Sequence, residues 1–305
     1  MVSSGEDAQR TTPPAERIAG FMHDFSIEVL PRETERPADF ASVPPGTSIY
    51  LTRLPKAHFA STVQAAQRVR EAGLRAVPHL TARTIRDAAD LREQISALAE
   101  AGVDEILLVA GSQEPPLGTF ADTLQVLATG ELERAGIRRI GVAGHPEGHP
   151  EAVEAALDGA LMEKNAFARR TGLELYLVTQ FFFDAAPVVA WERRIRALGN
   201  RLPIRVGFHG LTGTAGLMKH ALACGVGESI KVLARHTNLL QIALVRSPDR
   251  LLVEIVRATS RDENSLFERA HFFPLGGLAR TALWASAVAA NRFSLDGDGS
   301  IRLAN

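Results

Sequence analysis

The chain has 305 residues, of which 46% are hydrophobic and 23% charged, a balance typical of a globular protein with a large core. Its formal net charge of −1 argues against binding to nucleic acid or an acidic membrane, so we expect a small-molecule substrate. The single cysteine, Cys224, excludes an internal disulfide and fits a cytoplasmic location. Residues 1–20 are polar and contain prolines, which indicates a flexible leader rather than a signal peptide, and no apolar run reaches the roughly 18 residues of a membrane span.

From residue 21 to residue 305, short β-rich runs alternate with longer helical patterns. The expected strands are Phe25–Leu30, Ser48–Leu54, Arg75–Leu80, Glu105–Ala110, Arg139–Ala143, Glu174–Phe183, Ile204–Phe208 and His271–Leu275. The expected helices are Phe59–Ala72, Thr84–Ala101 with Thr84 as cap, Phe120–Ala135 interrupted at Gly130, Pro150–Thr171, Val188–Leu198, Ala215–His236, Leu251–Thr259 and Leu278–Asn291. Helical crossovers make the strands parallel, so the pattern predicts a single-domain α/β protein, a (β/α)8 TIM barrel over residues 21–305.

A doubly wound open sheet is the competing architecture. Such a sheet usually has a glycine-rich phosphate-binding turn after its first strand. Here the first strand is followed by Pro31-Arg32-Glu33 instead, which favours the barrel.

Polar side chains gather at the C-terminal ends of the expected strands, where TIM barrels place their active sites. They are Glu28, Thr52, His79, Thr81, Ser112, Gln113, Glu114, His145, Glu147, His149, Gln180 and His209. Their convergence on one mouth of the barrel is a stronger signal than any single residue.

Glu28 has the clearest chemical role in this set. It stands in an apolar strand, and burial raises the pKa of a carboxyl toward neutrality, which suits a general acid. An ion pair with an arginine such as Arg53 is the structural alternative. Glu147 and Asp184 are rival acids, but we expect both in more solvated loops.

His145 and His149 are four residues apart, a spacing that also occurs among metal ligands. Pro146 and Pro150 prevent a continuous helix across them, and no cysteine is near, so we expect no metal. A loop whose histidines bind the polar groups of a ligand is the favoured interpretation.

Gln180 ends an apolar strand, and its amide donates and accepts hydrogen bonds at once, which suits a pterin or purine edge. Taken alone, His79 and His209 are more typical of buried core histidines. The aromatic run after Gln180 is likewise more typical of core than of a stacking platform.

Four segments, in this order, resemble the methylenetetrahydrofolate reductase family. They are Phe25-Ser26-Ile27-Glu28-Val29 followed by Pro31-Arg32, then Pro78-His79-Leu80-Thr81, Val142-Ala143-Gly144-His145-Pro146-Glu147-Gly148-His149-Pro150, and Val178-Thr179-Gln180-Phe181-Phe182-Phe183-Asp184. The resemblance extends over about Phe25 to Phe293.

This resemblance implies a TIM barrel that carries FAD and reduces 5,10-methylenetetrahydrofolate to 5-methyltetrahydrofolate with NADH or NADPH. It implies that Glu28 is the catalytic acid and that Gln180, Phe182 and His209 lie at the folate. The residues that it places at the flavin are Thr52, His79, Thr81, Gly111, Ser112, His145, His149, Lys164 and Asn165.

Two segments depart from the family's pattern. The family usually has Arg-Gly-Asp after strand four, but the stretch here is Ala110-Gly111-Ser112-Gln113-Glu114-Pro115-Pro116, with no aspartate in that place. The family usually has an Asn-Arg pair after strand eight, but the stretch here is Phe273-Pro274-Leu275-Gly276-Gly277. These changes motivate an alternative, a flavin-free tetrahydrofolate-binding methyl-transfer protein of the same fold. A non-catalytic folate or flavin binder is a third interpretation, which the presence of both Glu28 and Gln180 disfavours. The choice of nicotinamide and the oligomeric state stay open, and a homo-oligomer is compatible with the sequence.

Overall fold

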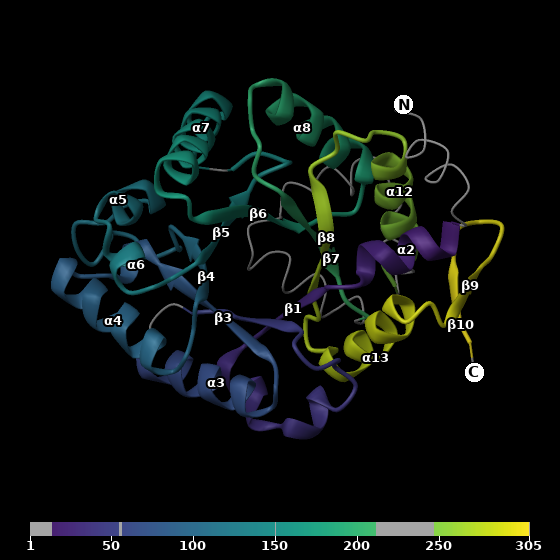
Figure 1. The fold of residues 1–305 in the computed structure, drawn as a ribbon, viewed down its shortest axis with the longest axis horizontal. Coiled ribbons are helices and arrows are strands. Elements are labelled where there is room, and N and C mark those ends of the chain that lie inside the picture. Colours follow the sequence, from purple (N-terminus) through teal and green to yellow (C-terminus); the bar gives the residue numbers. More distant parts are fainter. Residues whose placement is uncertain (1–13, 55–56, 150, 212–246, 305) are drawn as a thin grey trace, which may run out of the picture.

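Eight parallel strands close into a barrel, in a computed structural model that describes residues 14–54, 57–149, 151–211 and 247–304 (Figure 1). Each strand pairs with the next along the chain, and β1 pairs with β8 to complete the ring. The strands are β1 (Ser26–Val29), β2 (Ser48–Leu51), β3 (Arg75–Thr81), β4 (Glu105–Val109), β5 (Arg139–Gly144), β6 (Glu174–Phe181), β7 (Ile204–His209) and β8 (Phe267–Phe273). The predicted TIM barrel is confirmed.

Helices surround this barrel (Figure 1). They are α3 (Phe59–Glu71), α4 (Ala88–Glu100), α5 (Thr123–Ala128), α6 (Glu131–Arg134), α7 (Glu154–Thr171), α8 (Ala185–Ala197), α12 (Asp249–Ser260) and α13 (Leu278–Ala289), with short 3-10 turns η1 (Pro31–Glu35), η2 (Pro37–Phe40) and η3 (Ala82–Thr84). In the part of the chain that the structure describes, no helix is long and apolar enough to cross a membrane.

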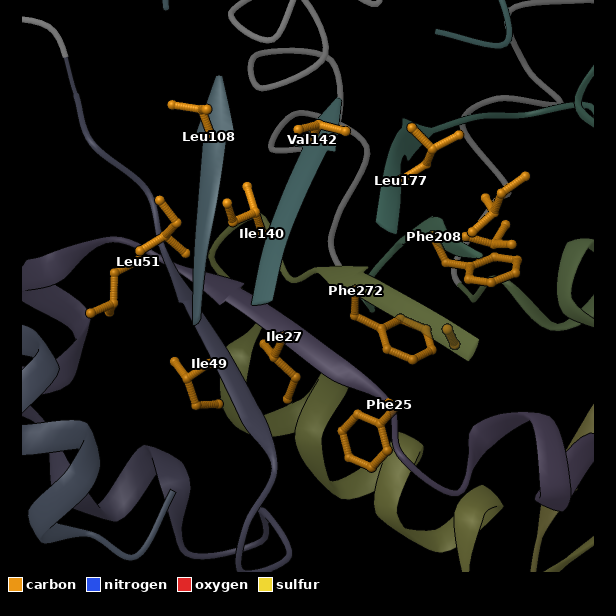
Figure 2. Close-up of a cluster of buried hydrophobic side chains, with 14 of the residues drawn as sticks. Phe25, Ile27, Ile49, Leu51, Leu108, Ile140, Val142, Leu177, Phe208 and Phe272 are labelled. Atoms are coloured by element: carbon orange, nitrogen blue, oxygen red, sulfur yellow. The ribbon is translucent and has the colours of Figure 1, made fainter. Parts of the chain in front are cut away.

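The main hydrophobic core lies between the strands and the helices. Alternate residues of each strand face outward, and Ile27, Ile49, Val142, Phe208 and Phe272 belong to this layer (Figure 2). Each such side chain contributes about 1.5–3 kcal/mol when it is fully buried. This layer fixes the strand register, and therefore fixes which residues face the barrel interior.

The barrel interior contains a charged pair at the N-terminal ends of the strands. Arg205 Nη1 donates to Glu105 Oε1 at 2.8 Å, and the hydroxyl of Tyr176 donates to the same oxygen at 2.7 Å. The hydroxyls of Tyr50 and Tyr176 are 2.8 Å apart, and Arg205 also donates to Tyr50. Gly141 makes room for this group, since a Cβ there would lie 2.8 Å from the Tyr176 ring.

The interpretation of residues 1–20 as a flexible leader is wrong from Pro14 onward. Pro14–Met22 forms α2, whose buried residues include Ile18, Phe21 and Met22, and it packs on α12, α13 and β8. These apolar side chains recur at helical spacing in a segment that its prolines and polar residues make look irregular. Residues 1–13 lie outside the described residues.

Several element boundaries differ from the sequence expectation. Helix α4 begins after Asp87, whose carboxylate accepts from Ala89 N and Asp90 N, so Asp87 and not Thr84 is the cap. Strand β8 begins before His271 and ends at Phe273. The C-terminal hairpin of β9 (Phe293–Leu295) and β10 (Ile301–Leu303) was not expected. The expected helix Ala215–His236 lies outside the described residues.

Candidate active site

Glu28 lies near the C-terminal end of β1, with its side chain 16% exposed at the barrel mouth. Thr52 Oγ1 donates to Glu28 Oε1 at 2.7 Å. The imidazole Nε2 atoms of His79 and His271 lie 3.4 Å and 3.5 Å from Glu28 Oε2. Strands β1, β2, β3 and β8 therefore bring their side chains together on one carboxylate. The alternative of an ion pair between Glu28 and Arg53 is not what the structure shows, because Arg53 donates to Gln94.

His271 is fully buried and contacts side chains on three sides. Its Nδ1 is 2.8 Å from Ser26 Oγ, its Nε2 faces Glu28, and its ring packs edge-on against Tyr50 with centroids 4.5 Å apart. Ser26 and His271 are register partners in the β1–β8 pair that closes the barrel. Barrel closure therefore positions the imidazole beside Glu28.

The expectation that the pKa of Glu28 is raised is wrong. Burial alone would raise it, but the charges and hydrogen bonds of His79 and His271 outweigh burial and hold the pKa well below its usual range. Burial lowers the pKa of His271, although the Glu28 carboxylate opposes that shift. The resting site therefore holds a carboxylate surrounded by donors.

Aromatic side chains line the mouth beside β6, β7 and β8. Phe183 stacks on His209 with ring centroids 5.9 Å apart, and Phe273 contacts both Phe181 and His271. Phe183 and Phe273 are half-buried, which leaves part of each ring accessible. This wall offers apolar faces to a planar ligand.

The placement of Phe182 at the substrate is wrong. Phe182 is 1% exposed and packs against Phe208 in the layer between barrel and helices. The register of β6 shifts between Val178 and Phe181, and beyond this shift the neighbours Phe181 and Phe183 face the mouth while Phe182 faces outward.

His209 is 1% exposed at the end of β7. Its Nδ1 donates to the Gly210 carbonyl at 3.0 Å, which makes Nε2 the acceptor of a neutral ring, and burial lowers the pKa of His209. Among the residues that the structure describes, Nε2 has no hydrogen-bond partner. Gln180 is half-buried near the end of β6, at the same end of the barrel as Glu28.

The loop after β4 crosses close to β3. Gly111 has a φ of +84°, and a Cβ there would lie 3.1 Å from Thr81 Cβ. The Thr81 hydroxyl is 2.5 Å from that of Thr84, and Ser112 is exposed on the rim. Arg83 joins three loops of this rim, since it contacts Glu114, Glu151 and the Ala121 carbonyl.

His145 and His149 contact each other in the loop after β5, with ring centroids 5.1 Å apart. Burial, with smaller contributions from His149 and Lys164, lowers the pKa of His145 to about 4, so His145 is neutral at pH 7. Within the described ranges, no three His, Cys, Asp or Glu side chains form a group that would hold a metal ion.

Comparison with known proteins identifies the family. A family model described as methylenetetrahydrofolate reductase matches residues 47–234, more than half of the chain. The chain belongs to the methylenetetrahydrofolate reductase family. A 5,10-methylenetetrahydrofolate reductase from Pectobacterium carotovorum subsp. carotovorum is 32% identical over 160 residues, which are 50% of this chain and 50% of that protein. The match thus spans about half the length of this relative.

Two solved structures resemble the fold. A putative phosphonomutase from Burkholderia cenocepacia has 15% identity and a TM-score of 0.48, and covers 91% of this chain and 99% of that one. A dihydropteroate synthase from Thermus thermophilus has 16% identity and a TM-score of 0.42, with 85% and 91% covered. Neither likeness bears on function.

In this member of the methylenetetrahydrofolate reductase family, a cavity of about 330 Å³ opens beside the mouth. Its lining runs from His145 and Gly148 down between α7 and α8 to Lys164 and Trp191. Burial lowers the pKa of Lys164. The cavity therefore presents an amine and an indole next to the histidine loop.

Asn165 lies apart from this cavity and from the mouth. Its amide donates to Asn200 at 2.8 Å and to the Leu161 carbonyl, and its oxygen accepts from Arg201 N at 2.8 Å. With its side chain fully used in the packing of α7 against the turn before β7, Asn165 does not face a ligand. The expected flavin contact of Asn165 is therefore contradicted.

His271, Ser26, Tyr50, Phe183 and Phe273 are site residues that the sequence interpretation missed. His271 stood at the start of the expected eighth strand, far from its C-terminal end. An earlier start of the eighth strand would have put His271 near its C-terminal end. Alternation along His271-Phe272-Phe273 then turns His271 and Phe273 toward the barrel mouth and Phe272 outward.

Proposed function

We propose that this protein reduces 5,10-methylenetetrahydrofolate to 5-methyltetrahydrofolate, with FAD as cofactor and NADH or NADPH as electron donor. The observation that carries the proposal is the Glu28 carboxyl, held at the barrel mouth by Thr52, His79 and His271 in a chain of this family. A cytoplasmic location fits such a metabolic enzyme.

The reaction needs a proton at one nitrogen of the folate. The bridging carbon becomes electrophilic when its bond to that nitrogen breaks, and the departing nitrogen keeps the electron pair and must be protonated. Glu28 lies at the mouth with two imidazoles on one carboxylate oxygen, so a proton on this cluster is available to a ligand above it. We therefore assign the proton transfer to Glu28.

The aromatic wall and its polar neighbours suit the pterin. Phe183 and Phe273 offer ring faces, and the Gln180 amide both donates and accepts, whereas the buried His209 ring supports Phe183 by stacking on it. A pterin presents N–H donors and acceptors along one edge of a planar ring, which matches this set.

Replacing Gln180 with alanine should weaken the binding of the folate. A lost polar contact to a buried ligand costs about 1–3 kcal/mol, so the KM for methylenetetrahydrofolate should rise on the order of tenfold to a hundredfold. Steady-state kinetics at varied folate concentration measure this effect, with oxidation of the nicotinamide by added quinone as the control that should stay unchanged. An unaltered KM would remove Gln180 from the substrate site.

Residues beside the mouth fit a flavin nucleotide. His145 and Lys164 line one cavity, and the glycine backbone at Gly111 leaves the β4 loop without a side chain next to Thr81. We infer that His145, His149 and Lys164 hold the cofactor, together with the backbone of Gly111 and Ser112. We expect Thr52, His79 and Thr81 beside the cofactor. In the free protein, Thr52 and His79 contact Glu28, and Thr81 contacts Thr84. FAD, when bound, supplies the hydride.

The purified protein should carry FAD or bind it when it is added. The flavin absorbance bands after gel filtration measure retention, and titration with FAD measures affinity. Lys164→Met should weaken the binding about tenfold, since it removes a charge-assisted contact to the diphosphate, whereas Arg169→Met, at an exposed cation of the same helix that does not line the cavity, is the matched control. Absence of binding at high micromolar FAD would favour the flavin-free methyl-transfer alternative.

A further inference from the structure

The inference concerns how the site positions the Glu28 carboxyl, and it rests on the proposed function. Glu28 faces two imidazoles that look alike in the sequence but differ in surroundings. His271 is fully buried, whereas His79 is 7% exposed at the mouth. One oxygen, Glu28 Oε2, is near both Nε2 atoms.

Ser26 determines the state of His271. His271 Nε2 lies 3.5 Å from Glu28 Oε2 without forming a hydrogen bond among the described residues, and because a carboxylate only accepts, the ring must turn an Nε2–H toward it. In a neutral ring Nδ1 then bears the lone pair, and Ser26 Oγ, 2.8 Å away, must donate to it. Ser26 is 1% exposed, so its hydroxyl serves the imidazole and is out of reach of a ligand.

The charges around His271 keep its ring neutral. The groups that face it are Glu28 on β1, Tyr50 on β2, His79 on β3 and Arg205 on β7. Burial lowers the pKa of His271, and the guanidinium of Arg205 and the His79 ring add to that shift against the opposing Glu28 carboxylate. A second proton on His271 is therefore unfavourable.

We propose that Ser26 locks His271 as a neutral ring whose Nε2–H faces Glu28, so that the carboxyl is held in position at the mouth. In the reaction, Glu28 Oε2 takes up a proton from solvent at the mouth and passes it to the departing nitrogen of the folate, which keeps the electron pair of its broken bond to the bridging carbon. His271 stays neutral throughout and is thus a positioning residue.

Nitrogen NMR of the full protein labelled at its nine histidines tests the lock directly. His271→Gln assigns the His271 signals by their loss. In the wild type at pH 7, His271 should show an unprotonated Nδ1 and a protonated Nε2. Ser26→Ala should abolish this single tautomer, and Ser48→Ala, at the neighbouring register position of β2, should preserve it. An Nδ1–H tautomer or a cationic His271 in the wild type would overturn the proposal.

Kinetics separate positioning from a merely structural role. Ser26→Ala should slow folate reduction up to about tenfold, the size of one lost neutral hydrogen bond. His271→Gln keeps an N–H donor and should retain most of the activity. His271→Phe has no such donor and should lose the activity. The pH profile of its residual activity should shift upward, because the pKa of Glu28 rises without the donor. Equal losses in both His271 variants would contradict the proposal. If the wild type reduced no folate, the proposed function would fail, while the NMR result would still decide the tautomer.

Discussion

Glu28→Gln should lower the rate of methylenetetrahydrofolate reduction by at least about a hundredfold, because general acid catalysis contributes about 10²–10⁴-fold. Glutamine keeps the shape of the side chain and can still accept from Thr52, but it cannot take up a proton and pass it to the folate nitrogen. The rate of product formation at saturating folate measures the effect. Circular dichroism and thermal unfolding establish that the variant is folded.

Glu147→Gln is the matched control for this prediction. Burial, with the nearby Asp184, raises the pKa of Glu147 to about 7, which makes it the rival acid of the mouth. It lies in the loop after β5, where its carboxyl is partly desolvated but the side chain as a whole is exposed, so we expect this variant to keep a rate near that of the wild type. A large loss in Glu147→Gln, with little loss in Glu28→Gln, would reassign the acid.

Glu105→Gln should destabilise the protein by about 3–5 kcal/mol, because it leaves the buried Arg205 guanidinium without its counter-charge. Arg205 and Arg139 hold the pKa of Glu105 below its usual value although burial raises it. The stabilisation by Glu105 is therefore complete above its unfolded pKa of about 4.5 and is lost as the pH falls below it.

Urea unfolding at pH 7 measures this change in the free energy of unfolding. Asp296→Asn removes an exposed partner of Arg302 and is the matched control, with an expected loss below about 1 kcal/mol. If Glu105→Gln cost no more than this control, the Tyr50 hydroxyl and the Tyr176 ring would suffice to compensate Arg205.

The strand pattern predicted the barrel because each strand is a short apolar run bounded by turn residues, and helical crossovers allow only parallel pairing. It also predicted that Glu28 and His79 lie at the same mouth of the barrel, since both stand at the C-terminal ends of strands; their 3.4 Å contact was not predicted. It did not predict α2, because the polar and proline-containing N-terminal segment hides its apolar face.

The chemistry of the site was harder to predict than its location. The pKa of Glu28 depends on His271, and that contact arises only when β8 closes against β1 across most of the chain. Phe182 was misplaced for a similar reason, since the irregular register between Val178 and Phe181 decides which ring of the run faces the mouth. Neither the contact of His271 with Glu28 nor the orientation of Phe182 can be predicted from the residues next to them in the sequence.

The most direct test is the formation of 5-methyltetrahydrofolate by the purified protein. The protein is mixed anaerobically with methylenetetrahydrofolate and either NADH or NADPH, with FAD present and omitted, and the product is quantified by mass spectrometry. We expect the product with one of the two donors, dependence on FAD, and loss of at least about a hundredfold in Glu28→Gln. Folate that binds but yields no product with either donor, with or without FAD, would contradict the proposed reaction.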